Sequence, residues 1–85
     1  MSEAETEARA ALRARAVTHP LREKILFALG EREASPSQLA HALDAPLGVV
    51  AYHVRVLAQL GMIRRVRRAP CRGSLASYYR AEPRP

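Results

Sequence analysis

Hydrophobic residues recur at helical spacing in the stretch that follows His19. Apolar side chains fall at positions i, i+4, i+7 and i+8, namely Leu21, Ile25, Ala28 and Leu29. A proline at the first position and a glycine after the last favour a helix from Pro20 to Gly30. Phe27, the one phenylalanine, is expected in the core or against another helix. Residues 3–17 are rich in Ala, Glu and Arg and predict a further helix, whose narrow apolar stripe packs weakly by itself.

Helix-start signals predict a second and a third helix close together. The segment Ser35-Pro36-Ser37-Gln38 is a capping box with proline at the first helical position, and it begins a short helix with Leu39 facing inward. Residues 44–46 end this helix and begin the next one. A short helix, a turn of three or four residues and a longer helix predict a helix-turn-helix at about residues 35–60.

The longer helix, about residues 46–60, has two different faces. At 100° per residue, one side carries an apolar stripe made of Leu47, Val50, Val54 and Leu57. The opposite side carries Gly48, Tyr52, Arg55 and Gln59, with Val49 beside them. His53 lies at the margin of the apolar stripe and is expected to pack against the core. Gly61 is expected to end the helix in the left-handed conformation.

After Gly61 the spacing of apolar residues changes to that of β-strands. Residues 62–68 and 75–80 predict two strands, and residues 69–74 between them contain Pro70 and Gly73, which favour a turn. We therefore predict a β-hairpin at about residues 62–80 and a frayed tail at 81–85. The fold class is mainly α with a β-hairpin wing (α+β), a single winged helix-turn-helix domain over residues 1–85.

Charge is divided unevenly along the 85 residues. Residues 1–44 hold six basic and seven acidic side chains, whereas residues 45–85 hold eight arginines and one acidic residue, Glu82. Five of those arginines lie between residues 64 and 72. A basic half rich in arginine indicates a polyanionic partner, although an arginine-rich composition by itself is also common in chains from GC-rich genomes.

Other functional classes have little support in the sequence. Cys71 is the one cysteine, so no internal disulfide or zinc framework is expected, and it is read as an exposed thiol without a role. The acidic N-terminus and the lack of a long apolar run indicate a cytoplasmic protein without a membrane partner. No paired carboxylates, glycine-rich phosphate loop or metal-binding histidine pair is present, so we expect no enzyme activity, cofactor, metal or evident small-molecule effector.

The predicted fold suggests how double-stranded DNA would be bound. An α-helix fits the major groove, and the arginines of a hairpin suit phosphates or the minor groove. The candidate DNA contacts are Gly48, Val49, Tyr52, Arg55 and Gln59 on the helix, and Arg65, Arg67, Arg68 and Arg72 on the hairpin. Arg64 and Arg65 point to opposite faces of their strand, so only one of them is expected to share this role.

From about residue 19 to residue 80 the chain resembles the ArsR-like winged helix-turn-helix transcription regulators. The resemblance rests on His19-Pro20-Leu21-Arg22, Ser37-Gln38-Leu39-Ala40, the segment Val50 to Leu57, Leu60-Gly61-Met62-Ile63, Arg72-Gly73 and Tyr78-Tyr79-Arg80. It implies a sequence-specific DNA-binding regulator that is a homodimer. The stretch 38–43 lacks the cysteines of metal-sensing members, so metal sensing is not expected.

The resemblance is weakest at the start of the reading helix. That start is usually rich in Ser, Gln and Thr in the family, whereas here it is Pro46-Leu47-Gly48-Val49. Tyr52 and Arg55 are therefore the expected base readers, with Val49 placed to touch a thymine methyl. Two alternatives stay open: a winged-helix protein–protein interaction module, and a protein that binds nucleic acids without sequence preference.

Overall fold

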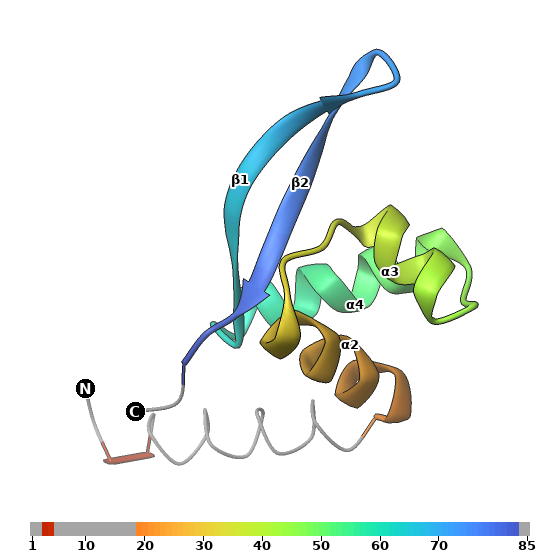
Figure 1. Cartoon of the computed structure of the whole chain (residues 1–85). Coiled ribbons are helices and arrows are strands. Elements are labelled where there is room, and N and C mark those ends of the chain that lie inside the picture. The colour runs from red at the N-terminus through yellow and green to blue at the C-terminus, as the bar shows by residue number, and fades with distance from the viewer. Residues whose placement is uncertain (1–2, 5–18, 84–85) are drawn as a thin grey trace.

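The computed structural model describes residues 3–4 and 19–83. In that part of the chain, helices α2 (Pro20–Glu31), α3 (Pro36–Ala42) and α4 (Leu47–Gln59) precede a hairpin of strands β1 (Ile63–Cys71) and β2 (Ser74–Ala81) (Figure 1). This order confirms the mainly α fold with a β-hairpin wing. Of the helix expected at about 3–17, Glu3 and Ala4 are helical, and the rest lies outside the described residues. None of the described helices is long and apolar enough to cross a membrane.

The core forms where α2, α3 and α4 meet the start of the hairpin. Its buried apolar side chains are Ile25, Leu29, Ala34, Leu39, Val50, Val54, Leu57 and Ile63. Burying a large aliphatic side chain contributes about 1.5–3 kcal/mol relative to leaving it exposed. The packing therefore confirms the apolar faces predicted for all three helices.

Two residues predicted for the core are exposed instead. Phe27 is 74% exposed, because its position on α2 lies about 160–200° around the helix from both Ile25 and Leu29. Leu47 is 51% exposed, since it is the first residue of α4 and the buried face of that helix begins one turn later, at Val50. The core placements of Phe27 and Leu47 were wrong for the same reason: an apolar residue is buried only where a second element covers it.

The helix boundaries follow from local hydrogen bonds. Ser35 and Gln38 form the predicted capping box, with bonds of 3.1 and 3.2 Å between each side chain and the other residue's backbone N–H. Helix α2 continues one residue past Gly30 to Glu31, because the N–H of Arg32 still donates to the carbonyl of Ala28 at 3.1 Å. The predicted end at glycine was therefore one residue early.

Residues in the left-handed region close both α3 and α4. Asp44 has φ 50°, and the next N–H, that of Ala45, donates back to the carbonyl of Ala40 at 3.0 Å. Gly61 has φ 73°, and the N–H of Met62 donates to the carbonyl of Leu57 at 3.0 Å. These are Schellman-type ends, which confirms Gly61 as the residue after the helix.

The hairpin is longer and its turn shorter than the sequence predicts. Strand β1 runs to Cys71 and β2 begins at Ser74, so the turn consists of Arg72 and Gly73 alone. Pro70 lies in β1, opposite Leu75, and not in the turn; an edge strand tolerates proline because no neighbouring strand needs its N–H.

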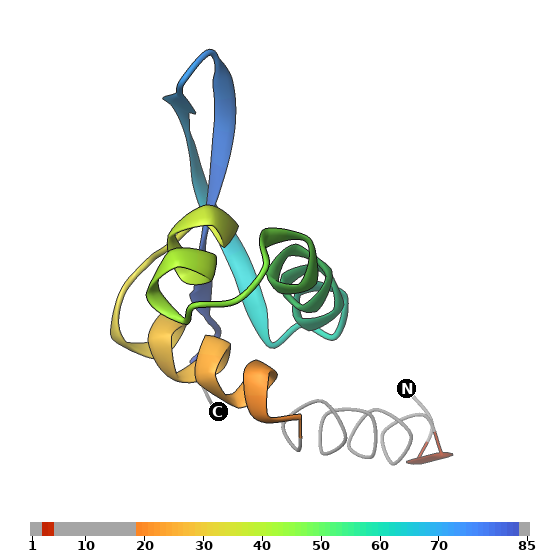
Figure 2. The same cartoon turned by 90° about the vertical axis from the view of Figure 1, so that its right-hand side faces the viewer.

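The C-terminal end of the hairpin is also more ordered than predicted. Ala81 belongs to β2 and pairs with Ile63, and the N–H of Glu82 donates to the carbonyl of Met62 at 2.9 Å. Residues 81 and 82 are thus not a frayed tail, because this pairing closes the base of the hairpin against the end of α4. Beyond that base, the hairpin projects well past the helices (Figure 2).

Candidate nucleic-acid interface

Helix α4 presents the predicted polar face to solvent. Gly48, Val49, Tyr52, Arg55 and Gln59 are all exposed, and Tyr52 is 53% exposed. They lie opposite Val50, Val54 and Leu57, whose burial fixes the rotation of the helix about its axis. The sequence therefore correctly predicted that all five residues lie on the exposed side of the helix.

The first turn of this face is apolar in space as well as in sequence. Pro46 is the N-cap and makes no side-chain hydrogen bond to the helix, and Leu47 and Val49 are both exposed beside it. The polar groups of the face begin one turn later, with the Tyr52 hydroxyl, the Arg55 guanidinium and the Gln59 amide. Hydrogen bonds to base edges can come only from this later part of the helix.

A shallow hollow joins α4 to the base of the hairpin. Arg55 and Gln59 line it from α4, Tyr79 lines it from β2, and Pro36 lies at its edge. Tyr79 is also packed against the core, so the hollow has a fixed wall on the hairpin side. Arg55 and Gln59, two of the candidate DNA contacts on α4, therefore lie on a surface that continues onto the wing.

A β-bulge divides the arginines of β1 between the two faces of the hairpin. Arg65 pairs with Tyr79 and Arg68 pairs with Ser77, whereas the bulge between Arg65 and Arg67 leaves Val66 without a partner. Side chains two residues apart in β2 share a face, so Arg65 and Arg68 lie on the face that carries Tyr79.

Arg64 and Arg67 lie on the other face, since they pair with Arg80 and Tyr78. The sequence correctly predicted that Arg64 and Arg65 lie on opposite faces of the strand. Strict alternation would also have placed Arg65 and Arg67 on the same face, which the structure does not show. The sequence does contain a signal for the bulge. Ile63 and Val66 are both apolar but three residues apart, and a regular strand places residues three apart on opposite faces.

Arg67 already has protein partners in the structure. Its Nε donates to Oε1 of Glu33 at 2.6 Å, and its guanidinium carbon lies 4.0 Å from the centre of the Tyr78 ring. Glu33 belongs to the connection between α2 and α3. Arg67, which the sequence predicts as a DNA contact, therefore lies on the hairpin face opposite Tyr79. It is held there by Glu33, a residue that no pattern in the sequence singled out.

The tip of the hairpin holds Arg72 in an uncommon conformation. Arg72 and Gly73 have φ 48° and 81°, as in a type I′ turn, where the first position favours Asn or Gly. A side chain in this region costs about 1–2 kcal/mol. The Ser74 hydroxyl donates to the carbonyl of Cys71 at 3.2 Å and closes the turn.

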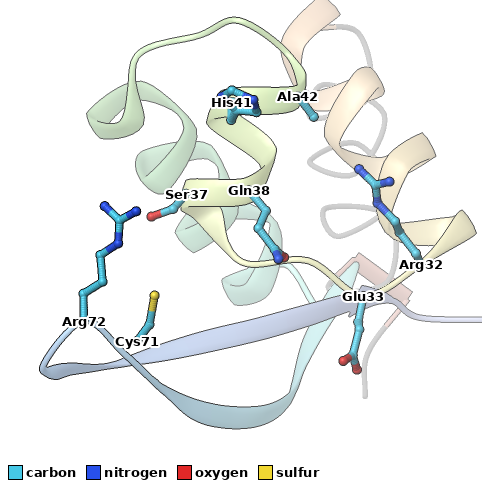
Figure 3. Close-up of a pocket in the computed structure, with 8 residues that line it drawn as sticks. All are labelled: Arg32, Glu33, Ser37, Gln38, His41, Ala42, Cys71 and Arg72. Atoms are coloured by element: carbon cyan, nitrogen blue, oxygen red, sulfur yellow. The ribbon is translucent and has the colours of Figure 1, made fainter.

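Arg72 also borders a cleft between the hairpin tip and α3. Arg72 and Cys71 extend from the hairpin toward α3, which contributes Ser37, Gln38, His41 and Ala42 (Figure 3). Arg32 and Glu33 line the cleft from its other end. His41 is exposed, Cys71 is exposed as expected, and no cluster of metal-ligating residues occurs in the described ranges 3–4 and 19–83.

His53 packs behind the exposed face of α4. It is 6% exposed, its Nδ1 accepts a hydrogen bond of 2.9 Å from Nε of Arg22, and its ring lies 4.5 Å from that of His19. Tyr52 contacts the same ring edge to face, at 5.3 Å. Burial lowers the pKa of His53 below 6.5, and the charges of His19 and Arg22 lower it further. The predicted packing role is confirmed.

Several solved structures share the fold. Reduced HlyU from Vibrio cholerae is 20% identical over 93% of this chain and 78% of its own, with a TM-score of 0.76. A homodimeric winged helix-turn-helix DNA-binding domain from Mycobacterium bovis is 22% identical over 95% and 72%, with a TM-score of 0.79. An ArsR-like transcriptional regulator from Rhodococcus sp. RHA1 is 27% identical over 96% and 70%, with a TM-score of 0.71.

Sequence comparison gives the family. No curated protein sequence matches the chain significantly. The family model described as "Helix-turn-helix domain" matches residues 17–66, which is more than half of the chain and includes all three described helices. The Rhodococcus protein is a transcriptional regulator, in agreement with the expectation of a regulator and not an enzyme. The chain therefore belongs to the helix-turn-helix domain family, and its resemblance to the ArsR-like winged helix-turn-helix regulators is confirmed.

Proposed function

We propose that this protein is a transcription regulator that recognises a specific sequence in duplex DNA. The observation that carries the proposal is the continuous surface formed by α4 and one face of the hairpin. Arg55 and Gln59 of α4 and Tyr79 of β2 line one hollow, and the Tyr79 face also carries Arg65 and Arg68. A helix beside a cationic hairpin suits a major groove and the phosphates that flank it.

Helix α4 supplies the base contacts in this proposal. Arg55 reaches acceptors on a guanine edge, Tyr52 and Gln59 offer further hydrogen-bonding groups, and Val49 packs on a thymine methyl. Gly48 has open space around its Cα and no side chain, so the backbone of the first turn can come close to the DNA. With few polar groups in that first turn, recognition depends on Arg55 and Tyr52.

The wing supplies phosphate contacts that do not depend on sequence. Arg65 and Arg68 extend from the hairpin face that adjoins α4, and Arg72 sits at the tip. We leave Arg67 out of this group, because its guanidinium pairs with Glu33 on the opposite face. Each phosphate that an arginine neutralises releases condensed counterions, so binding weakens as salt rises.

The active form in this proposal is a homodimer that acts in the cytoplasm. The winged helix-turn-helix domain from Mycobacterium bovis is homodimeric, and Phe27 leaves an exposed aromatic side chain on α2. Two copies related by a twofold axis would bind an inverted repeat, with half-sites about one helical turn, or 34–36 Å, apart.

Selection of bound duplexes from a random pool tests the proposal most directly. We expect an enriched inverted repeat, bound at least about tenfold more tightly than a scrambled duplex at the same salt concentration. Arg55→Ala should reduce this preference by about tenfold. Arg68→Ala should weaken binding to both duplexes equally and reduce the slope of log K against log salt by about 0.9. Lys24→Ala, which removes a charge from the exposed side of α2, is the matched control and should leave the preference unchanged.

The same titration separates the alternatives. Equal affinity for all duplexes and for single-stranded RNA would replace the proposal with binding that lacks sequence preference. Absence of binding to any nucleic acid at low salt would favour a protein partner, for which the exposed Leu47 and Val49 at the start of α4 are the supporting observation.

A further inference from the structure

The base of the wing is tied to the connection between α2 and α3 by several polar contacts. Ala34 pairs with Tyr79 at the outer edge of β2, through backbone hydrogen bonds of 2.9 and 3.1 Å. Nη2 of Arg80 donates to the carbonyl of Gly30 at 3.2 Å. The ion pair between Glu33 and Arg67 lies beside these contacts, because Glu33 directly precedes Ala34 in the chain.

These contacts bear on the direction of the hairpin because packing against the core involves only its base, at Ile63, Tyr79 and Ala81. Beyond Ile63, neither β1 nor β2 contributes a buried side chain. The Ala34–Tyr79 pairing and the Arg80–Gly30 hydrogen bond both hold β2 near its C-terminal end, so rotation of the longer part of the hairpin about that end is the motion left to restrict. A contact farther along the hairpin, on its other strand, restricts this rotation.

Glu33 and Arg67 supply such a contact on β1. The Arg67 guanidinium has Glu33 at 2.6 Å and the Tyr78 ring at 4.0 Å, so it joins the α2–α3 connection to both strands. The Glu33 and Arg67 side chains are 38% and 49% exposed, and an ion pair this exposed contributes little to the stability of a fold. The geometry therefore indicates a role in orientation and not in overall stability.

We propose that Glu33, Arg67 and Tyr78 form a latch that sets the direction of the wing, and that Glu33 and Arg67 are positioning residues. The latch holds the face with Arg65 and Arg68 toward the DNA side of α4. It also neutralises Arg67, so that this arginine does not attract phosphates from the opposite face. The part that concerns DNA rests on the proposed function, whereas the part that concerns wing motion does not.

The first test needs no DNA. Cys71 is the one cysteine and is exposed near the wing tip, so a maleimide dye attached there reports on the motion of the hairpin. In time-resolved anisotropy, Glu33→Ala and Arg67→Ala should each raise the amplitude of the nanosecond component by about twofold. The double variant should move no more than either single variant, because both remove one contact.

Arg68→Ala is the matched control for the motion. It removes the same type of side chain from the next residue of β1, on the other face of the hairpin, and should leave the anisotropy decay unchanged. Far-ultraviolet circular dichroism and thermal unfolding confirm that each variant is folded. Decays of Glu33→Ala and Arg67→Ala that superimpose on that of the unmodified sequence would overturn the latch.

The second test asks whether Arg67 contacts DNA. Arg67→Ala should weaken binding to the selected duplex about threefold to tenfold without changing the salt slope, whereas Arg68→Ala should lower that slope by about 0.9. Glu33→Ala should raise affinity for a scrambled duplex and raise the slope by about 0.9, since it releases the Arg67 cation. A slope lowered equally by both arginine variants would make Arg67 a phosphate contact and overturn its positioning role. If the unmodified protein bound no duplex, the proposed function would fail, and the anisotropy decays would still decide the latch.

Discussion

Helix α4 and the hairpin wing form one surface, yet they are held in place by different forces. Helix α4 buries Val50, His53, Val54 and Leu57 and exposes the opposite side. The wing has no buried side chain beyond Ile63, and it is directed by backbone pairing and by polar contacts with residues 30–34. Nonpolar burial depends little on salt, whereas exposed ion pairs are screened by it. The helix is therefore the more rigid partner and the wing the more adjustable one.

This difference matches the two tasks of the proposed function. Hydrogen bonds to base edges need a rigid element, because a displacement of about 1 Å removes them. Contacts with phosphates carry no sequence information and tolerate small motions. A helix fixed by the core and a hairpin fixed by a polar latch divide these tasks between them.

The largest expected effect compares two leucines, one in each region. Leu57 of α4 is fully buried, and Leu57→Ala should lower the free energy of unfolding by about 2–5 kcal/mol, since it leaves a cavity in a small core. Leu75 of the wing is 63% exposed, and Leu75→Ala should change that free energy by less than about 0.5 kcal/mol. Urea denaturation followed by circular dichroism measures both values. Equal losses would mean that the wing contributes to the core, contrary to the comparison.

The next effect concerns the junction where α4 passes into the wing. Gly61 has φ 73°, a conformation that a residue with Cβ adopts with strain, so Gly61→Ala should lower the free energy of unfolding by about 1–2 kcal/mol. Gly30→Ala is the matched control, because Gly30 is helical, exposed and has open space where a Cβ would lie. That control should leave stability unchanged or raise it by about 1 kcal/mol at most. A neutral Gly61→Ala would show that the junction is not constrained.

The smallest effect is a dependence of stability on pH that originates in α4. Burial and the nearby charges of His19 and Arg22 lower the pKa of His53 below 6.5, so the folded state resists protonation of that ring. The unfolded chain then binds more protons as the pH falls through its ordinary pKa, and the free energy of unfolding falls over the range between that ordinary pKa and the lowered pKa of the folded state. The contribution is fully present above this range and is lost as the pH falls through it.

His53→Gln tests this assignment, because a glutamine carbonyl can still accept the hydrogen bond from Arg22. The variant should show a flatter stability profile across the same pH range, measured by urea denaturation at each pH. A profile as steep as that of the unmodified protein would assign the pH dependence to other groups.

Local patterns in the sequence were sufficient for the helices and for the exposed face of α4. The capping box at Ser35 and Gln38 and the glycine after α4 are confirmed because their hydrogen bonds join residues close in sequence. The position of Arg55 on the side of α4 opposite the apolar stripe follows from helical geometry alone. The fold class and the face of α4 that would meet DNA could therefore be predicted before any tertiary contact was known.

Only the tertiary structure decided how the arginines of the wing are divided. Alternation predicts that Arg65 and Arg67 share a face, but the bulge at Val66 places Arg65 with Arg68 instead. Glu33 is distant in sequence from Arg67, and the Ala34–Tyr79 pairing brings the two together. Phe27 is exposed because no described element covers its side of α2. The sequence by itself determined what each short segment forms, since those interactions are local. The roles of residues in the wing depended on register and on long-range pairing, which only the folded chain establishes.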